Sequence, residues 1–87
     1  MSEQLKEVVV LSIRDISGQI LGEEQIPLDV WYDGLHPLID DSAVRKDQGV
    51  RSIEGIQLNS RGDVSSKWRV EYDAEGRVKE STELPIS

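Results

Sequence analysis

The chain has 87 residues, no cysteine and no phenylalanine, and its 17 acidic and 10 basic side chains give a formal net charge of −7 at pH 7. This length fits one domain, residues 1–87, and the lack of cysteine excludes disulfides and thiolate metal ligands. No apolar run approaches the roughly 20 residues of a membrane helix, and the first residues lack a secretory signal pattern. We therefore expect a cytoplasmic protein without membrane contact.

The acidic excess lies in the first half of the chain. Residues 1–44 contain nine acidic and two basic side chains, whereas residues 45–87 contain eight of each. Clustered Lys and Arg drive binding to nucleic-acid phosphates, so this distribution argues against a nucleic-acid partner. It is compatible with a basic protein partner and equally with a plain solvated surface.

The first predicted elements are two strands. Residues 8–13 form an apolar run rich in β-branched side chains, which indicates a central strand covered on both faces. Residues 15–19 carry turn chemistry around Gly18. Residues 20–26 then return as an edge strand with an acidic middle, which Pro27 ends.

The next segment, residues 27–49, has no strand pattern and forms an insert between the second and third strands. Apolar residues at i, i+3, i+4 and i+7 predict one face of a short helix, formed by Leu28, Trp31, Tyr32 and Leu35. A second helical turn is predicted between a Ser42 cap and a Gly49 stop. Because 23 residues is long for a connection in so small a domain, we expect this insert to carry function.

Residues 50–59 return to strand character, but Ile53 is out of phase with Ile56 and Leu58, which predicts a bulge at Glu54–Gly55. The last third contains the clearest pattern, two alternating segments around turns at Gly62 and Gly76. Its apolar face consists of Trp68, Val70 and Tyr72, and its polar face of Lys67, Arg69 and Glu71.

These elements predict a mainly β fold of about five antiparallel strands: a hairpin, the insert, and a three-stranded meander. We expect either a small open barrel or a single sheet with the insert packed over one face, and a small β-sandwich is the alternative. The predicted core comprises Val8, Val10, Ile13, Ile20, Ile26, Ile56, Leu58, Trp68, Val70, Tyr72 and Val78.

Candidate chemistry is sparse. Asp33, His36, Asp40 and Asp41 could supply metal ligands, but their spacing matches no established ligand pattern. There is no cysteine nucleophile and no Gly-x-Ser-x-Gly elbow. We therefore predict no metal, no cofactor and no enzymatic activity. A basic stripe on the last hairpin, formed by Lys67, Arg69, Arg77 and Lys79, is explained most simply by cross-strand ion pairs.

The preferred function is a small acidic protein-binding module, such as an inhibitor, an immunity-type protein or an assembly subunit, that docks on a basic partner. A second copy of the chain is a further candidate partner. The predicted contact residues belong to the insert, where aromatic side chains lie among carboxylates; they are Asp29, Trp31, Tyr32, Asp33, Leu35, Asp40 and Asp41. The alternative is a small-ligand pocket between sheet and insert, lined by Trp31, Leu35, Leu38 and Trp68.

Overall fold

The computed structural model describes residues 7–32 and 36–86. Within these residues, five strands form one open antiparallel sheet in the order β2-β1-β3-β4-β5. The strands are β1 Val8–Arg14, β2 Ile20–Pro27, β3 Ser52–Leu58, β4 Val64–Tyr72 and β5 Val78–Glu83. The prediction of a mainly β fold is confirmed, and of the predicted alternatives it is the single sheet that forms.

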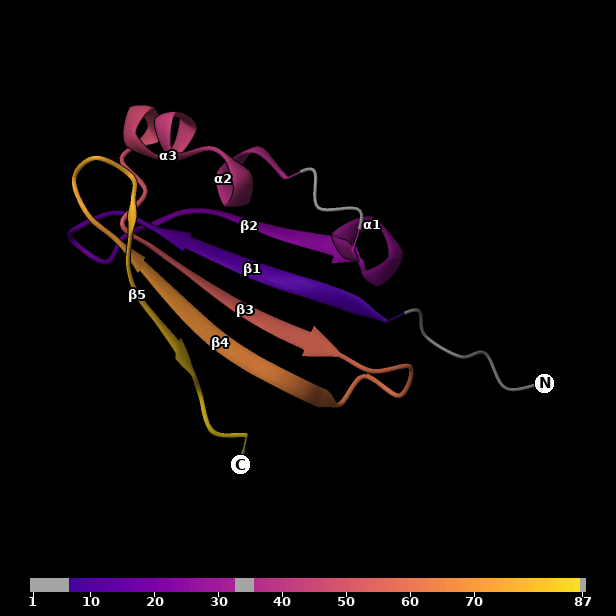
Figure 1. Cartoon of the computed structure of the whole chain (residues 1–87). Helices are drawn as coiled ribbons and strands as arrows, with labels where there is room; N and C mark the ends of the chain where they lie inside the picture. Colours follow the sequence, from indigo (N-terminus) through magenta and orange to yellow (C-terminus); the bar gives the residue numbers. More distant parts are fainter. Residues whose placement is uncertain (1–6, 33–35, 87) are drawn as a thin grey trace.

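Three short helices lie over one face of this sheet (Figure 1). They are α1 Leu28–Tyr32, α2 Pro37–Asp40 and α3 Ser42–Gln48, and all three fall within the predicted insert. Isolated helices of this length are marginal in water, so their stability must come from packing against the sheet. The opposite face of the sheet is not covered by any described helix or strand.

The ends of α3 follow from its local sequence. Gly49 ends the helix with a φ of 74°, as predicted. The predicted N-terminal cap is wrong by one residue, because Asp41 has the extended backbone and its carboxylate accepts hydrogen bonds from the amides of Ala43 and Val44. The negative charge of Asp41 suits the positive end of the helix dipole, which explains why Ser42 becomes the first helical residue instead.

The hydrophobic core lies between the sheet and the helices. Its buried side chains are Val9, Leu11, Ile13, Ile26, Leu38, Val50, Ile53 and Tyr72, with Leu28, Trp31, Ile39, Val44, Trp68 and Val70 packed against them. The inward orientation predicted for Trp68, Val70 and Tyr72 is confirmed. The positions predicted for Ile13 and Ile26 are confirmed as well.

The predicted core is wrong for the other face of the two central strands. Val8 and Val10 of β1 and Ile56 and Leu58 of β3 are only half-buried, because they point away from the helices. Two further predicted core residues on the edge strands are exposed, namely Ile20 and Val78. Since β1 is apolar on both sides, its sequence cannot say which set of residues the helices will cover.

The error in β3 has a related cause. Pairing between β1 and β3 runs without interruption from Val8–Leu58 to Arg14–Ser52, so no bulge forms at Glu54–Gly55. Ile53 therefore faces the core while Ile56 faces the open side. The irregularity in β3 lies instead between Gln57 and Leu58, in the pairing with β4.

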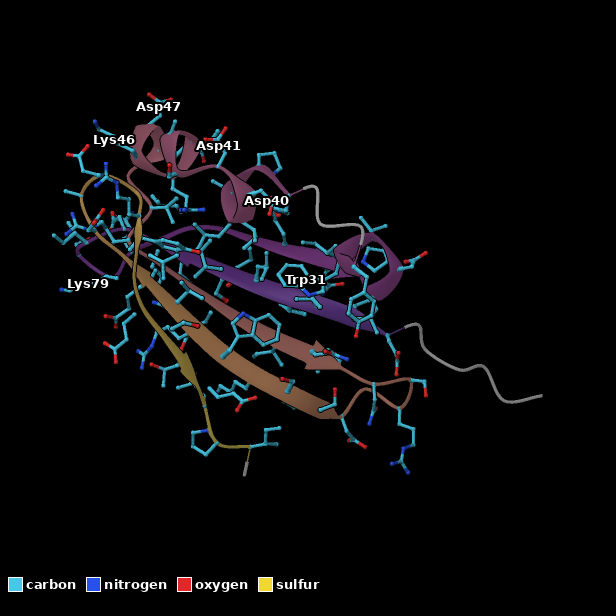
Figure 2. All side chains as sticks on the ribbon, in the orientation of Figure 1. Trp31, Asp40, Asp41, Lys46, Asp47 and Lys79 are labelled. Atoms are coloured by element: carbon cyan, nitrogen blue, oxygen red, sulfur yellow. The ribbon has the colours of Figure 1, made fainter. Side chains whose placement is uncertain are left out.

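Gly55 has a packing role in the middle of the sheet. A Cβ built on it would lie 2.2 Å from the ring of Trp68, so the indole rests directly on the glycine backbone. Trp31 from α1 packs on Trp68 in turn, with ring centroids 5.8 Å apart and a tilt of 42°. Figure 2 shows Trp31 directed from α1 toward the sheet. The missing side chain at Gly55 thus makes room for Trp68, on which Trp31 packs with a tilted ring.

The orientation of β3 can be tested with one matched pair of substitutions. Ile53→Ala removes a side chain that is 1% exposed in the core, and we expect it to lower the free energy of unfolding by about 3 kcal/mol. Ile56→Ala makes the same change three residues away on the open face and should cost roughly 1 kcal/mol. Urea unfolding of both variants measures the difference. Equal losses, or the larger loss at Ile56, would contradict the register.

Candidate functional site

A buried arginine joins the insert to the sheet. Arg45 of α3 is 5% exposed, and its Nε donates a hydrogen bond to the carbonyl of Gly76 at 2.7 Å. Its Nη1 donates to the carbonyls of Leu38 and Ile39 at 3.1 and 2.8 Å. The guanidinium carbon lies 4.3 Å from the centre of the Tyr72 ring. We call these contacts the Arg45 clasp.

The Arg45 clasp contains no carboxylate, since none of the ion pairs among the described residues involves Arg45. Backbone carbonyls and an aromatic face instead provide the negative potential that a buried guanidinium needs. Burial raises the pKa of the Tyr72 hydroxyl, and the positive charge of Arg45 opposes that rise to a smaller extent. The clasp therefore holds the end of α2, α3 and the β4–β5 turn together.

The β4–β5 turn fits closely against α3. A Cβ on Gly76 would lie 2.2 Å from the carbonyl oxygen of Ser42, and the φ of Gly76 is 80°. Glycine is thus required at this position both by the backbone conformation and by the contact. An exposed ion pair between Lys46 and Glu75, at 2.9 Å, bridges the same two segments on the outside.

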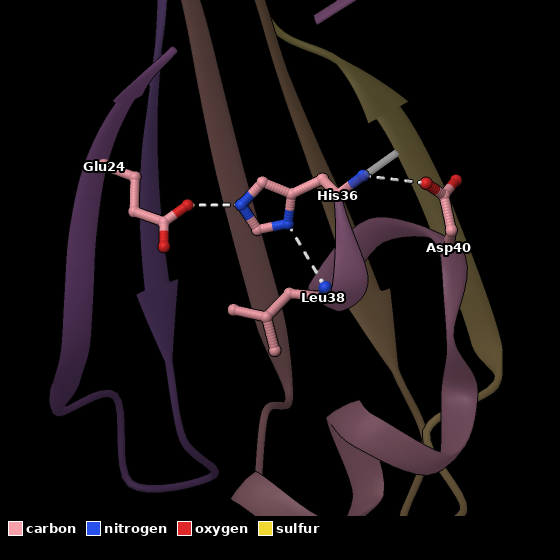
Figure 3. A network of polar contacts seen from close by, with 4 residues as sticks. All are labelled: Glu24, His36, Leu38 and Asp40. Carbon is pink, nitrogen blue, oxygen red and sulfur yellow. Dashed lines mark hydrogen bonds and ion pairs between the residues drawn. The ribbon is translucent and has the colours of Figure 1, made fainter. Parts of the chain in front are cut away.

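His36 makes a second connection between the insert and the sheet (Figure 3). Its Nδ1 accepts a hydrogen bond from the amide of Leu38 at 3.2 Å, which caps α2, and its Nε2 contacts the carboxylate of Glu24 on β2. The backbone amide of His36 donates to Asp40 at 3.0 Å. The cap assigns the ring hydrogen to Nε2. Both ring nitrogens are thus already engaged within the protein.

The hypothesis of a metal site at Asp33, His36, Asp40 and Asp41 can be examined only in part, because Asp33 lies outside the described residues. Over residues 7–32 and 36–86, the structure brings together no group of three His, Asp or Glu side chains suited to a metal ion. Asp40 and Asp41 have local partners, since Asp40 accepts from the His36 amide and Asp41 caps α3.

The other predicted contact residues divide between core and surface. Trp31 is half-buried against Trp68, so it is part of the packing, whereas the neighbouring Tyr32 is 73% exposed. The single helix face predicted for Leu28, Trp31 and Tyr32 is therefore divided, with Leu28 and Trp31 against the core and Tyr32 at the surface. Asp29 is exposed in the first turn of α1. Leu35, like Asp33, lies outside the described residues.

The outer side of α1 forms a defined surface. Val30 and Tyr32 are 52% and 73% exposed, while Leu28 on the same short helix packs against the core. An open hollow of about 390 Å³ adjoins this helix, lined by Glu7, Pro27, Leu28, Asp29 and Val30. The exposed side of α1 thus combines apolar side chains with carboxylates, while Leu28 packs the helix against the core.

Carboxylates also follow the outer side of the other two helices. Asp41 and Asp47 lie along α3 on the side away from the sheet, and Asp40 lies beside α2 (Figure 2); all three are exposed. Sequence reasoning missed Asp47, because it lies beyond the acidic first half. Together with the exposed residues of α1, these side chains form what we call the acidic insert surface. Its residues are Asp29, Val30, Tyr32, Asp40, Asp41 and Asp47.

The predicted space for a small ligand is largely occupied by the protein's own side chains. Trp31 and Trp68 contact each other, and Leu38 is buried in the core. The open hollow at α1 and a second hollow, on the uncovered side of the sheet, lie elsewhere. The geometry of the described residues therefore does not favour the ligand-pocket alternative.

The expected cross-strand ion pairs of the last hairpin do not form. In the part of the chain that the structure describes, the ion pairs are His36–Glu24, Lys46–Glu75 and Arg61–Asp63. Lys67, Arg69, Arg77 and Lys79 thus have no described carboxylate within ion-pair distance. Within the last hairpin the register gives one reason, because Arg69 lies opposite Thr82, and Glu71 lies opposite Glu80. On its other side, Arg69 lies opposite Glu54 of β3 without closing an ion pair.

None of the described helices is long and apolar enough to cross a membrane. Comparisons with protein-family models, with curated proteins and with solved structures give no significant match.

The Arg45 clasp can be tested by substitution. Arg45→Ala removes the donor from two buried carbonyls and one part-buried carbonyl, and we expect the free energy of unfolding to fall by about 3 kcal/mol. Lys46→Ala is a matched change at the neighbouring, exposed position of α3 and should cost less than about 1 kcal/mol. Chemical unfolding of both variants measures the effect. A small loss at Arg45 would show that the clasp contributes little to stability.

Proposed function

We propose that this protein is a protein-binding module whose acidic insert surface docks on a basic partner. The observation that carries the proposal is the exposed Tyr32 on α1, a helix held in place by Leu28 and Trp31. Exposed aromatic side chains on a fixed backbone are frequent anchors of protein interfaces. Val30 is a second exposed apolar side chain of the same helix.

Charge supports the same docking surface. Asp29, Asp40, Asp41 and Asp47 are all exposed, whereas the basic side chains of this region are not free to balance them: Arg45 is buried and Lys46 pairs with Glu75. The acidic insert surface therefore has a negative potential. Such a field attracts a basic partner over a distance of about a Debye length, roughly 8–10 Å at physiological salt.

The connections to the sheet support binding energetically. Because the Arg45 clasp and the His36–Glu24 contact hold α2 and α3 on the sheet, and Leu28 and Trp31 hold α1, little backbone freedom remains to be lost on association. A cytoplasmic inhibitor, immunity-type protein or assembly subunit would use such a preorganised surface. The proposal is binding without catalysis, and the engagement of both His36 ring nitrogens supports that choice.

The proposal predicts salt-sensitive capture of a basic protein that depends on Tyr32. The immobilised protein should retain such a partner from an extract of its own cells at low salt and release it at high salt. Tyr32→Ala should weaken the purified complex by at least about 2 kcal/mol, roughly 30-fold in Kd, measured by calorimetry. Asp29→Asn should slow association.

Two controls make this experiment decisive. Val78→Ala truncates a similarly exposed apolar residue on the edge strand β5, and Asp63→Asn removes an exposed charge from the β3–β4 turn. Both should leave the affinity and the association rate unchanged. A complex insensitive to Tyr32 and to salt, or co-purification of an apolar small molecule in place of any protein, would contradict the proposal.

A further inference from the structure

The uncovered face of the sheet contains a basic hollow. It has a volume of about 360 Å³ and lies where the β1–β2 turn meets the start of β3 and the end of β4. Its charged lining consists of Arg14, Arg51, Arg69, Lys79, Asp15 and Glu71. Four cationic and two anionic side chains give the hollow a formal net charge of +2, in a protein whose net charge is −7.

None of the four cations forms an ion pair with a described carboxylate. Arg14 donates to the carbonyl of Gly18 at 2.9 Å, and Arg51 donates to the carbonyl of Tyr72 at 3.3 Å. Among the described residues, no carboxylate lies within ion-pair distance of Arg14, Arg51, Arg69 or Lys79. Carboxylates border two of these cations, since Glu54 lies opposite Arg69, and a backbone hydrogen bond together with the charge of Arg51 lowers the pKa of Asp73. None of them closes an ion pair with the four cations, which remain gathered around one hollow.

The carboxylate of Asp15 is directed to its own turn. It accepts hydrogen bonds from the amides of Ser17 and Gln19 at 2.9 and 3.0 Å, and from the hydroxyl of Ser17 at 2.6 Å. Its acceptor capacity is thus largely taken up by the β1–β2 turn. Glu71 is the remaining carboxylate of the lining. Glu54, opposite Arg69 on β3, and Glu80, opposite Glu71 on β5, border the hollow on the same face.

From this arrangement we infer that the hollow is a binding site for a small phosphate-bearing anion. Guanidinium groups present paired donors that match phosphate oxygens, and the carbonyl contacts already hold Arg14 and Arg51 in place. The ligand class includes inorganic phosphate and the phosphate end of a small monoester. A nucleic-acid strand fits less well, because Glu54 and Glu80 lie on the same sheet face beside the cations and would repel an extended row of phosphates.

A titration with defined anions tests this inference. Inorganic phosphate and glycerol phosphate are added in separate experiments to the isotope-labelled protein at constant ionic strength, and backbone amide and arginine Nε–H resonances are followed by NMR. We expect saturable shifts confined to the β1–β2 turn and to the lining arginines. A higher affinity for the monoester identifies an esterified ligand, and a higher affinity for inorganic phosphate identifies the free ion; both support the site.

Substitutions with the same change of charge distinguish a built site from general attraction. Arg69→Gln and Lys79→Gln alter exposed side chains of the hollow, and each should weaken phosphate binding about five- to ten-fold. Lys67→Gln alters a cation on the same face outside the hollow lining, opposite Ile56, and should change the affinity less than about two-fold. Shifts that do not saturate, that chloride reproduces, or that Lys67→Gln reduces equally would overturn the inference. Because the acidic insert surface shares no residue with the hollow, this result is independent of the proposed function.

Discussion

The Arg45 clasp is the interaction on which the arrangement of this molecule depends. The three helices have five, four and seven residues, too few to form a stable unit by themselves. A cation buried at their junction would be costly without partners, and here it gains three carbonyl acceptors and an aromatic ring from α2, the β4–β5 turn and β4. These contacts can be satisfied only when the insert lies on the sheet.

This placement produces two surfaces of opposite character. On the covered side, the helices bury every second residue of the central strands, such as Val9, Leu11 and Ile13. The outer side of these helices is the acidic insert surface with Tyr32. On the other side, the sheet keeps half-buried aliphatic residues and the basic hollow around Arg69. The proposed docking surface and the proposed anion site thus lie on opposite sides of one sheet. Under these two proposals, a single small domain has two partners of different charge.

Strands and turns could be predicted from the sequence where one residue type decides the geometry. Alternation places Trp68 and Tyr72 inside, and glycines mark the hairpin turns correctly. The core side of β1 could not be predicted, since both of its faces are apolar and a shift by one residue exchanges them. Arg45 gave no local signal, because a basic residue in the last turn of a helix is common on surfaces. Its role depends on carbonyls 6, 7 and 31 residues away in the chain.

Native-state hydrogen exchange of the unmodified protein tests the central claim, that the clasp makes insert and sheet one cooperative unit. The informative amides are those of Arg45 and Val50, which are hydrogen-bonded within the insert, and that of Tyr72, which bonds to Arg51 at the sheet. If the clasp acts as described, the insert amides should exchange with the same free energy of opening as the core of β1 and β3. Exchange of the insert at a free energy several kcal/mol below that of the sheet would show that the helices open independently, and would contradict the account.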